Sequence, residues 1–119
     1  MAKPEHKQFA KPDETRKFDH GVMDVLQIGG GTVGRGTFQP GWRWSTHMKA
    51  GAGTELCEAP HFQYQISGRM RIKTADGAEF ETGAGDVVSL PSGHDAWVVG
   101  NEPVVVVDCH GATNYAKKK

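Results

Sequence analysis

Apolar and polar residues alternate in short segments along most of this chain, and glycine or proline separates one segment from the next. A period of two is typical of β-strands, and no segment shows a convincing helical period. We therefore expect about ten short strands, at residues 22–28, 32–38, 42–48, 56–59, 62–66, 69–74, 79–82, 87–90, 96–99 and 104–107.

Turn signals connect several of these strands. Asp76-Gly77 is a strong signal for a two-residue hairpin, and Ser67-Gly68 also predicts a tight hairpin turn. Residues 49–54 are rich in Gly and Ala and are expected to form a loop. Residues 104–107 are consecutive valines, and this lack of alternation indicates a strand that is buried on both faces.

Many short strands joined by tight turns are typical of layered or closed all-β proteins. A single antiparallel β-barrel or a two-sheet jelly roll would remove the exposed strand edges that an open sheet leaves. The 119 residues are enough for one hydrophobic core and too few for two. The expected organisation is a flexible N-terminal arm at residues 1–18, one β-barrel or jelly-roll domain at residues 19–112, and a C-terminal tail at residues 113–119.

The charge balance narrows the range of partners. Lys plus Arg number 14 and Asp plus Glu number 14, so the formal net charge at pH 7 is zero. A neutral chain gives no reason to expect nucleic acid or an anionic membrane as a partner. No apolar run approaches the ~20 residues of a membrane span, and the N-terminus lacks the apolar core of a secretory signal. We expect a cytoplasmic protein. Cys57 and Cys109 could form one disulfide, but in a cytoplasmic chain of this size a ligand role or a plain reduced thiol is favoured.

Cys57 and His61 are the strongest candidates for chemistry, because thiolate and imidazole are ligands of zinc and other late first-row metals. On a straight strand the two residues would be about 13 Å apart, too far to share one ion. Pro60 lies between them and favours a break in the strand. The sequence therefore predicts that both side chains face the same interior from adjacent strands.

Other residues are candidates for the surroundings of this site. Glu55 shares a strand face with Cys57 and is a possible fourth ligand, a proton-transfer group or simply a solvated carboxylate. The expected pocket-lining residues are Trp44, Gln63, Gln65 and Trp97. Gln63, Gln65 or Asp95 is expected to accept the second N–H of a ligating imidazole.

A structural interpretation stands beside each candidate. Cys57 is equally a buried core thiol, and His61 a half-buried imidazole. His94 follows Pro91-Ser92-Gly93 and is equally the cap of a turn. The tryptophans are equally ordinary core residues. Cys109 and His110 point to opposite faces of their strand and are weak metal candidates.

Two segments together carry a family resemblance. The stretch from Gly53 to Gly68, and the stretch from Gly85 to His94, resemble the two half-motifs of a cupin of the RmlC-like superfamily. In the first motif, counting back from Gly68, the acidic ligand position falls on His61 and the two histidine positions fall on Cys57 and Glu55. None of these is the usual residue type.

The second motif matches Gly85, Pro91 and Gly93, whereas its histidine position holds Ala96. His94 lies two residues earlier, on the same strand face, and would replace that imidazole.

Further phrases are similar to an uncharacterised bacterial subgroup of small cupins: Gly41-Trp-Arg-Trp-Ser45, Ser67-Gly-Arg-Met70, Gly93-His-Asp-Ala-Trp97 and Asn114-Tyr-Ala116. The resemblance implies the cupin fold and a site at Cys57, His61 and His94, but no substrate. It also implies a homodimer, which we expect to form through the polar N-terminal arm or the first strand.

One divalent transition metal is the expected cofactor. A Cys-His-His ligand set favours zinc, with iron, manganese, nickel and copper as alternatives. Two classes of function remain open: a metal-dependent enzyme acting on a small polar metabolite, of oxygenase, isomerase or hydrolase type, and a non-enzymatic module that binds or senses a small ligand or a metal.

Overall fold

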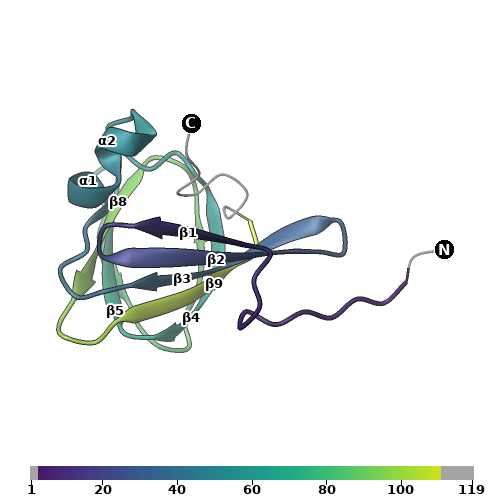
Figure 1. Ribbon diagram of the computed structural model, residues 1–119. Coiled ribbons are helices and arrows are strands. Elements are labelled where there is room, and N and C mark those ends of the chain that lie inside the picture. The colour runs from purple at the N-terminus through teal and green to yellow at the C-terminus, as the bar shows by residue number, and fades with distance from the viewer. Residues whose placement is uncertain (1–2, 111–119) are drawn as a thin grey trace.

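The computed structural model describes residues 3–110, and these residues form two antiparallel sheets and two short helices (Figure 1). The elements in chain order are β1 (Glu14–Phe18), β2 (Gly21–Ile28), β3 (Gly31–Phe38), α1 (Trp44–His47), α2 (Lys49–Ala52), β4 (His61–Ser67), β5 (Arg69–Thr74), β6 (Glu79–Thr82), β7 (Val87–Leu90), β8 (His94–Val99) and β9 (Val104–Asp108). The large sheet has the order β1-β2-β3-β9-β4-β7, and the small sheet has the order β6-β5-β8.

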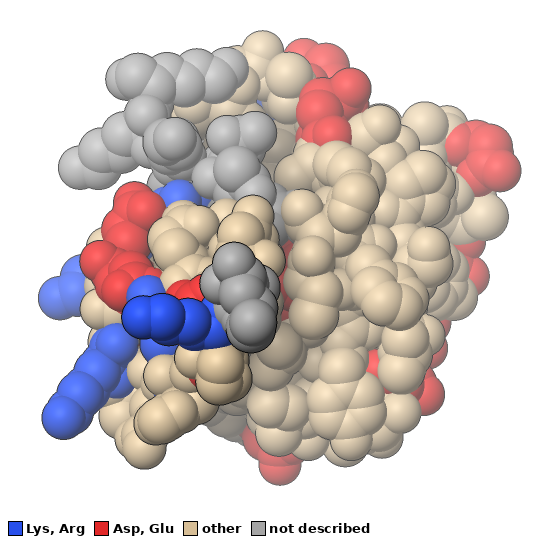
Figure 2. Space-filling model, turned by 90° about the vertical axis from the view of Figure 1, so that its right-hand side faces the viewer, with Lys and Arg blue, Asp and Glu red and all other residues tan. Residues whose placement is uncertain are grey.

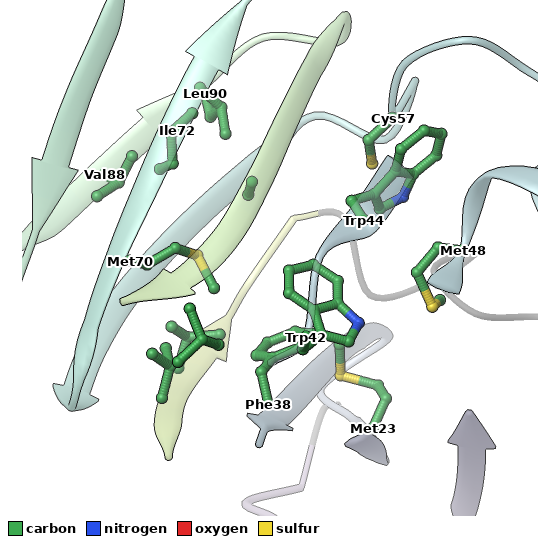
Figure 3. Close-up of a cluster of buried hydrophobic side chains, with 14 of the residues drawn as sticks. Met23, Phe38, Trp42, Trp44, Met48, Cys57, Met70, Ile72, Val88 and Leu90 are labelled. Carbon is green, nitrogen blue, oxygen red and sulfur yellow. The ribbon is translucent and has the colours of Figure 1, made fainter. Parts of the chain in front are cut away.

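The all-β expectation is confirmed, and of the two architectures expected, the jelly roll fits. The two sheets have separate edges and do not close into a barrel. The core lies between them, and most of its side chains are apolar (Figure 3). It consists of Met23, Val25, Phe38, Trp42, Trp44, Met48, Cys57, Met70, Ile72, Val88, Leu90, Ala96, Val98, Val104 and Val106.

Strand β4 has an unusual distribution of polarity. His61, Gln63 and Gln65 are buried, whereas Phe62, Tyr64 and Ile66 are exposed. Alternation along a strand fixes this division, because neighbouring side chains point to opposite faces. The polar face of β4 therefore points into the core, and buried polar groups need partners there.

The expected strand at residues 42–48 is wrong beyond its first residues. Arg43 forms an isolated bridge with Trp97, and the chain then turns into α1 and α2. Trp44 and Met48 are both buried, and their spacing of four residues suits a helix as well as a strand face. The expected loop at residues 49–54 is α2 up to Ala52, and Gly53 ends it with a φ of 74°.

The Ser67-Gly68 hairpin is also wrong, because β4 and β5 belong to different sheets. Gly68 instead carries the chain from one sheet to the other, with a φ of 79°. The Asp76-Gly77 hairpin is confirmed, since β5 and β6 pair in antiparallel register on either side of it.

Two further segments differ from expectation. Residues 56–59 form no strand, although Cys57 makes an isolated bridge with His94. In β9, Val104 and Val106 are buried but Val105 and Val107 are partly exposed, so only one face is fully covered.

The last five residues of the expected arm form β1, which pairs with β2 and buries Arg16. Its short charged sequence concealed the strand. The expected tail at residues 113–119 and the phrase at residues 114–116 lie outside the described residues. Within residues 3–110, no helix has the length and apolar character needed to cross a membrane.

The Gly68 crossover gives a prediction about stability. A Cβ atom at Gly68 would lie 2.5 Å from the Pro103 carbonyl oxygen and 2.8 Å from Val104 Cα, both backbone atoms, and the positive φ adds further strain. We expect Gly68→Ala to lower the free energy of unfolding by roughly 2–4 kcal/mol, measured by urea denaturation.

Gly77→Ala is the matched control, because Gly77 also has a positive φ (91°) but open space around it. Gly77→Ala should lower the free energy of unfolding by only about 1 kcal/mol. Equal losses at the two positions would show that the close approach to residues 103 and 104 does not matter.

Candidate metal centre

Cys57, His61 and His94 converge at one end of the space between the sheets. Their ligand atoms all lie within 4.8 Å of one another, and all three residues are buried. Cys57 Sγ is 3.8 Å from His61 Nε2, and the rings of His61 and His94 meet edge to face with their centroids 5.1 Å apart. The structure thus brings together the three residues that the sequence named as ligands.

The backbone around Pro60 explains how residues four apart in sequence reach the same point. Cys57 pairs with His94 of the small sheet: the Cys57 N–H donates to the His94 carbonyl at 2.7 Å, and the Gly93 N–H donates to the Cys57 carbonyl at 2.7 Å. Residues 58–60 have no regular structure, and His61 then opens β4 in the large sheet. The segment containing Pro60 crosses from one sheet to the other.

Asp108, the last residue of β9, orients His61. Its carboxylate accepts a hydrogen bond from His61 Nδ1 and is itself buried. The same carboxylate accepts from the backbone N–H of His110 at 2.9 Å and of Phe62 at 3.4 Å. A carboxylate that holds Nδ1–H fixes the tautomer and leaves the Nε2 lone pair available to a metal ion.

His94 is oriented in a similar way. Its Nδ1 lies 3.0 Å from the Pro91 carbonyl oxygen, which only accepts hydrogen bonds. Neutral His94 therefore carries its hydrogen on Nδ1, and Nε2 is again available as a ligand. The turn that the sequence resemblance identified, Pro91-Ser92-Gly93, thus supplies the acceptor that sets this imidazole.

Burial keeps Cys57 and His94 uncharged when the site holds no metal. Burial raises the pKa of the Cys57 thiol from 9.0 to about 11, and the nearby carboxylates of Glu58, Asp108 and Asp95 act in the same direction. Burial also lowers the pKa of His94 from 6.5 to about 4, and the charge of His61 adds to this effect. At pH 7 His94 is ready to ligate, whereas the thiol must lose its proton when a cation binds.

The three donors fit a transition metal. In a tetrahedral zinc site, a sulfur at about 2.3 Å and a nitrogen at about 2.0 Å from the ion lie about 3.5 Å apart. The distance of 3.8 Å between Cys57 Sγ and His61 Nε2 is close to this value. One thiolate and two imidazoles with fixed outer partners suit zinc better than magnesium or calcium, which prefer oxygen.

A cavity of about 30 Å³, counted as the space open to the centres of water molecules, adjoins the three donors. This is room for about two waters. Figure 3 shows the Trp44 indole beside Cys57 at its wall. The lining residues are Met23, Phe38, Trp44, Cys57, His61, Gln63, Met70, Ile72, Leu90, His94, Ala96, Val106 and Asp108.

Two of the expected pocket-lining residues, Trp44 and Gln63, line this cavity, and two do not. Gln65 is fully buried but engaged elsewhere, since it accepts a hydrogen bond from Thr82 Oγ1 and donates to the Gly68 carbonyl. Trp97 lies on the opposite face of β8 from His94, because the two are three positions apart along the strand. Its ring instead packs against the Arg43 guanidinium at 4.2 Å.

Glu55 does not reach the site. Its side chain is 87% exposed and forms an ion pair of 2.6 Å with Lys49, so the structure excludes it as a fourth ligand in this conformation. Asp95, expected behind an imidazole, accepts hydrogen bonds from the backbone of Ser45 and Ala96 instead.

Asp108 is the residue of the candidate site that the sequence interpretation missed. The signal was present: Val104 and Val106 are inward-facing, and the alternation places Asp108 on the same face. Because residues 104–107 were expected to be buried on both faces, the alternation of this strand was not used to place Asp108.

Comparisons with known proteins place the fold. No family model matches the sequence, and no curated protein sequence matches it significantly. A protein of unknown function from Rhizobium leguminosarum is structurally similar, with a TM-score of 0.65 and 20% identity over 90% of this chain and 95% of that one.

Two longer proteins are also similar. The 11S allergen of Cocos nucifera has a TM-score of 0.64 at 18% identity, over 92% of this chain and 34% of that one. The oxalate decarboxylase of Lactobacillus farciminis, in complex with formate, has a TM-score of 0.58 at 17% identity, over 82% of this chain and 30% of that one. The chain therefore spans about a third of their length. These likenesses show that it has the cupin fold that the sequence motifs implied.

The buried imidazole predicts a pH dependence for the metal-free protein. Below pH 6.5 the unfolded chain protonates His94, while the folded chain keeps it neutral down to about pH 4. Stability should therefore fall as the pH falls through this window, by at most about 3 kcal/mol. Urea denaturation in the presence of a chelator measures the loss.

His94→Gln should remove this share of the pH dependence, whereas His110→Gln, at an exposed histidine, should keep it. Parallel stability curves for wild type and His94→Gln between pH 6.5 and 4 would contradict the assignment.

Proposed function

We propose that this protein binds one divalent transition metal ion, zinc in first place, through Cys57, His61 and His94, and that it acts on a small polar ligand at that ion. The observation that carries the proposal is the orientation of the donors. Both imidazoles are held through Nδ1, by Asp108 and by the Pro91 carbonyl, so that both Nε2 atoms are available beside the Cys57 sulfur. Outer hydrogen bonds of this kind are typical of metal ligands.

Gln63 supports a polar ligand. Its side chain is buried and lines the cavity, and its amide makes no hydrogen bond to any other described residue. A side-chain amide both donates and accepts hydrogen bonds, so a polar ligand in the cavity that does the same would pair with it. The cavity limits that ligand to a few non-hydrogen atoms. Formate, bound by the L. farciminis oxalate decarboxylase, illustrates this size.

An enzyme is the first candidate class. Three protein ligands leave a further position on the ion for a substrate, and a bound ion of this type polarises an oxygen atom of that substrate. The chain's own residues would bind and orient it: Gln63 through its amide, and the wall of Trp44, Met70 and Ile72 by excluding bulk water. Reactions of isomerase or hydrolase type suit this arrangement better than an oxygenase, because the ligand set includes no carboxylate.

A binding or sensing module is the second candidate. The only carboxylate in the cavity wall within residues 3–110 is Asp108, which is engaged by His61. No general base other than the ligands themselves thus faces the cavity, which favours capture of a ligand or metal without turnover. Either class needs a reduced Cys57, which favours a cytoplasmic location.

Metal content of the purified protein tests the shared premise. We expect wild type, purified without chelator, to retain close to one tightly bound metal ion per chain after dialysis. His61→Ala and Cys57→Ser should lose nearly all of it, and Asp108→Asn should bind roughly 10- to 100-fold more weakly, because it removes only the outer partner of His61. Elemental analysis and competition with a chelator give these values.

Glu55→Gln is the control, since Glu55 is exposed and paired with Lys49. It should retain metal like wild type. If His61→Ala retained as much metal as wild type, His61 would not be a ligand. If wild type itself carried no metal, the proposed metal site would be wrong and only a metal-free binding module would remain.

We also propose a homodimer that packs through the outer face of β4 and β7. Phe62, Tyr64, Ile66 and Val87 are all exposed there, at 48–64%, and the outward positions of these strands carry no charged residue. Figure 2 shows one side of the molecule on which most of the surface is likewise uncharged. Contiguous exposed apolar side chains favour association, and an uncharged face suits a second copy of itself.

Light scattering should give twice the chain mass of 12.9 kDa at micromolar concentration, and Tyr64→Lys should give the monomer. Phe80→Lys, at an exposed apolar residue of the small sheet, should remain dimeric. A wild-type monomer across this range would contradict the proposal.

A further inference from the structure

A second group of potential metal ligands lies at the surface, between the β1–β2 turn and α1. Asp19 and His20 form the turn, and His47 is the last residue of α1. Their ligand atoms all lie within 4.8 Å of one another. Figure 1 shows α1 close to the end of the β1–β2 hairpin.

The two imidazoles and the carboxylate already face one another. His20 Nδ1 is 3.0 Å from Asp19 Oδ1, and His47 Nε2 is 3.7 Å from Asp19 Oδ2. The rings of His20 and His47 lie with their centroids 4.4 Å apart and tilted by 35°. A cation placed among the three would be bound by two ring nitrogens and a carboxylate oxygen at once.

His47 is fixed before any ion arrives. Its side chain is only 11% exposed. Its Nδ1 accepts a hydrogen bond from the Arg43 backbone N–H at 3.0 Å and also lies 3.2 Å from the Arg43 carbonyl oxygen. These contacts hold the ring in place, and an ion bound at Nε2 would select the tautomer in which Nδ1–H donates to that carbonyl. One ligand of the three therefore has little conformational freedom left to lose on binding.

His20 occupies a backbone position that a histidine seldom takes. Its φ is 64°, and within residues 3–110 it is the only residue other than glycine with a positive φ. Glycine or asparagine would fit this turn position with less strain. The strain does not itself show a ligand, but it allows His20 to be replaced by glycine without harm to the turn.

We propose that Asp19, His20 and His47 form a second site for a divalent transition metal ion, separate from Cys57, His61 and His94. Two imidazoles and one carboxylate favour zinc, nickel or copper, with water completing the shell. The ion would join the β1–β2 turn to α1. Since α1 also carries Trp44 in the cavity wall, occupancy of the surface site would restrain one wall of the candidate metal centre.

Zinc titration of chelator-stripped protein against a chromophoric competitor tests the proposal. Wild type should bind one more equivalent than His20→Gly and one more than His47→Gln. Loss of a direct ligand should weaken the site by more than the roughly 10- to 100-fold that loss of an outer partner costs. His6→Gln, at an exposed histidine away from the cluster, should titrate like wild type.

His61→Ala separates this result from the proposed function. In that variant added zinc should still raise the melting temperature, and combining it with His20→Gly should abolish the rise. His20→Gly should fold at least as stably as wild type without metal, so a lost equivalent cannot be ascribed to unfolding. The same number of equivalents in wild type, His20→Gly and His47→Gln would overturn the proposal, whatever the metal content of the buried site.

Discussion

The hydrogen bond between His61 and Asp108 ties the candidate metal centre to the register of the large sheet. In that register Gln63 of β4 stands opposite Asp108 of β9, so the carboxylate reaches back to the ring of His61 at the start of the strand. A slip of one residue would turn the polar face of β4 to solvent and its apolar face inward. The imidazole of His61 and the amide of Gln63 would then leave the core, and Asp108 on β9 would lose its imidazole partner.

The sequence predicted the parts of this arrangement that depend on residue type and local chain breaks. Cys57 and His61 have donor atoms, and Pro60 forces the bend that lets them converge. His94 follows a turn that glycine and proline define. Side chains alternate along a strand, so Gln63, two residues after His61, also points inward, as it does in the structure.

The remaining features depend on information that a local pattern does not hold. Helices of four residues are too short to reveal a period, so α1 and α2 were missed. Trp97 was placed in the pocket although an odd offset from His94 puts it on the other face of β8. The partner of Glu55 is set by the position of Lys49 on α2, which the sequence pattern did not predict.

The two ligand clusters differ in ways that follow from burial. Cys57, His61 and His94 are enclosed and soft in character, whereas Asp19, His20 and His47 form a half-exposed site with a carboxylate. The first should discriminate strongly among metals, because its donors are fixed on three sides. The second should exchange its ion more readily with solvent.

The crossing at Pro60 has a consequence for how the buried site is assembled. Cys57 is anchored to β8 in the small sheet, and His61 belongs to the large one, so the donors meet only after the two layers have docked. An ion would then find all three ligands only in the folded chain, unlike in zinc fingers, where metal and chain order together. The chain would fold first and form the three-ligand site, and the metal ion would bind to it afterwards. The identity of the captured ion would then be decided by a rigid enclosure rather than by whichever cation first meets the nascent chain.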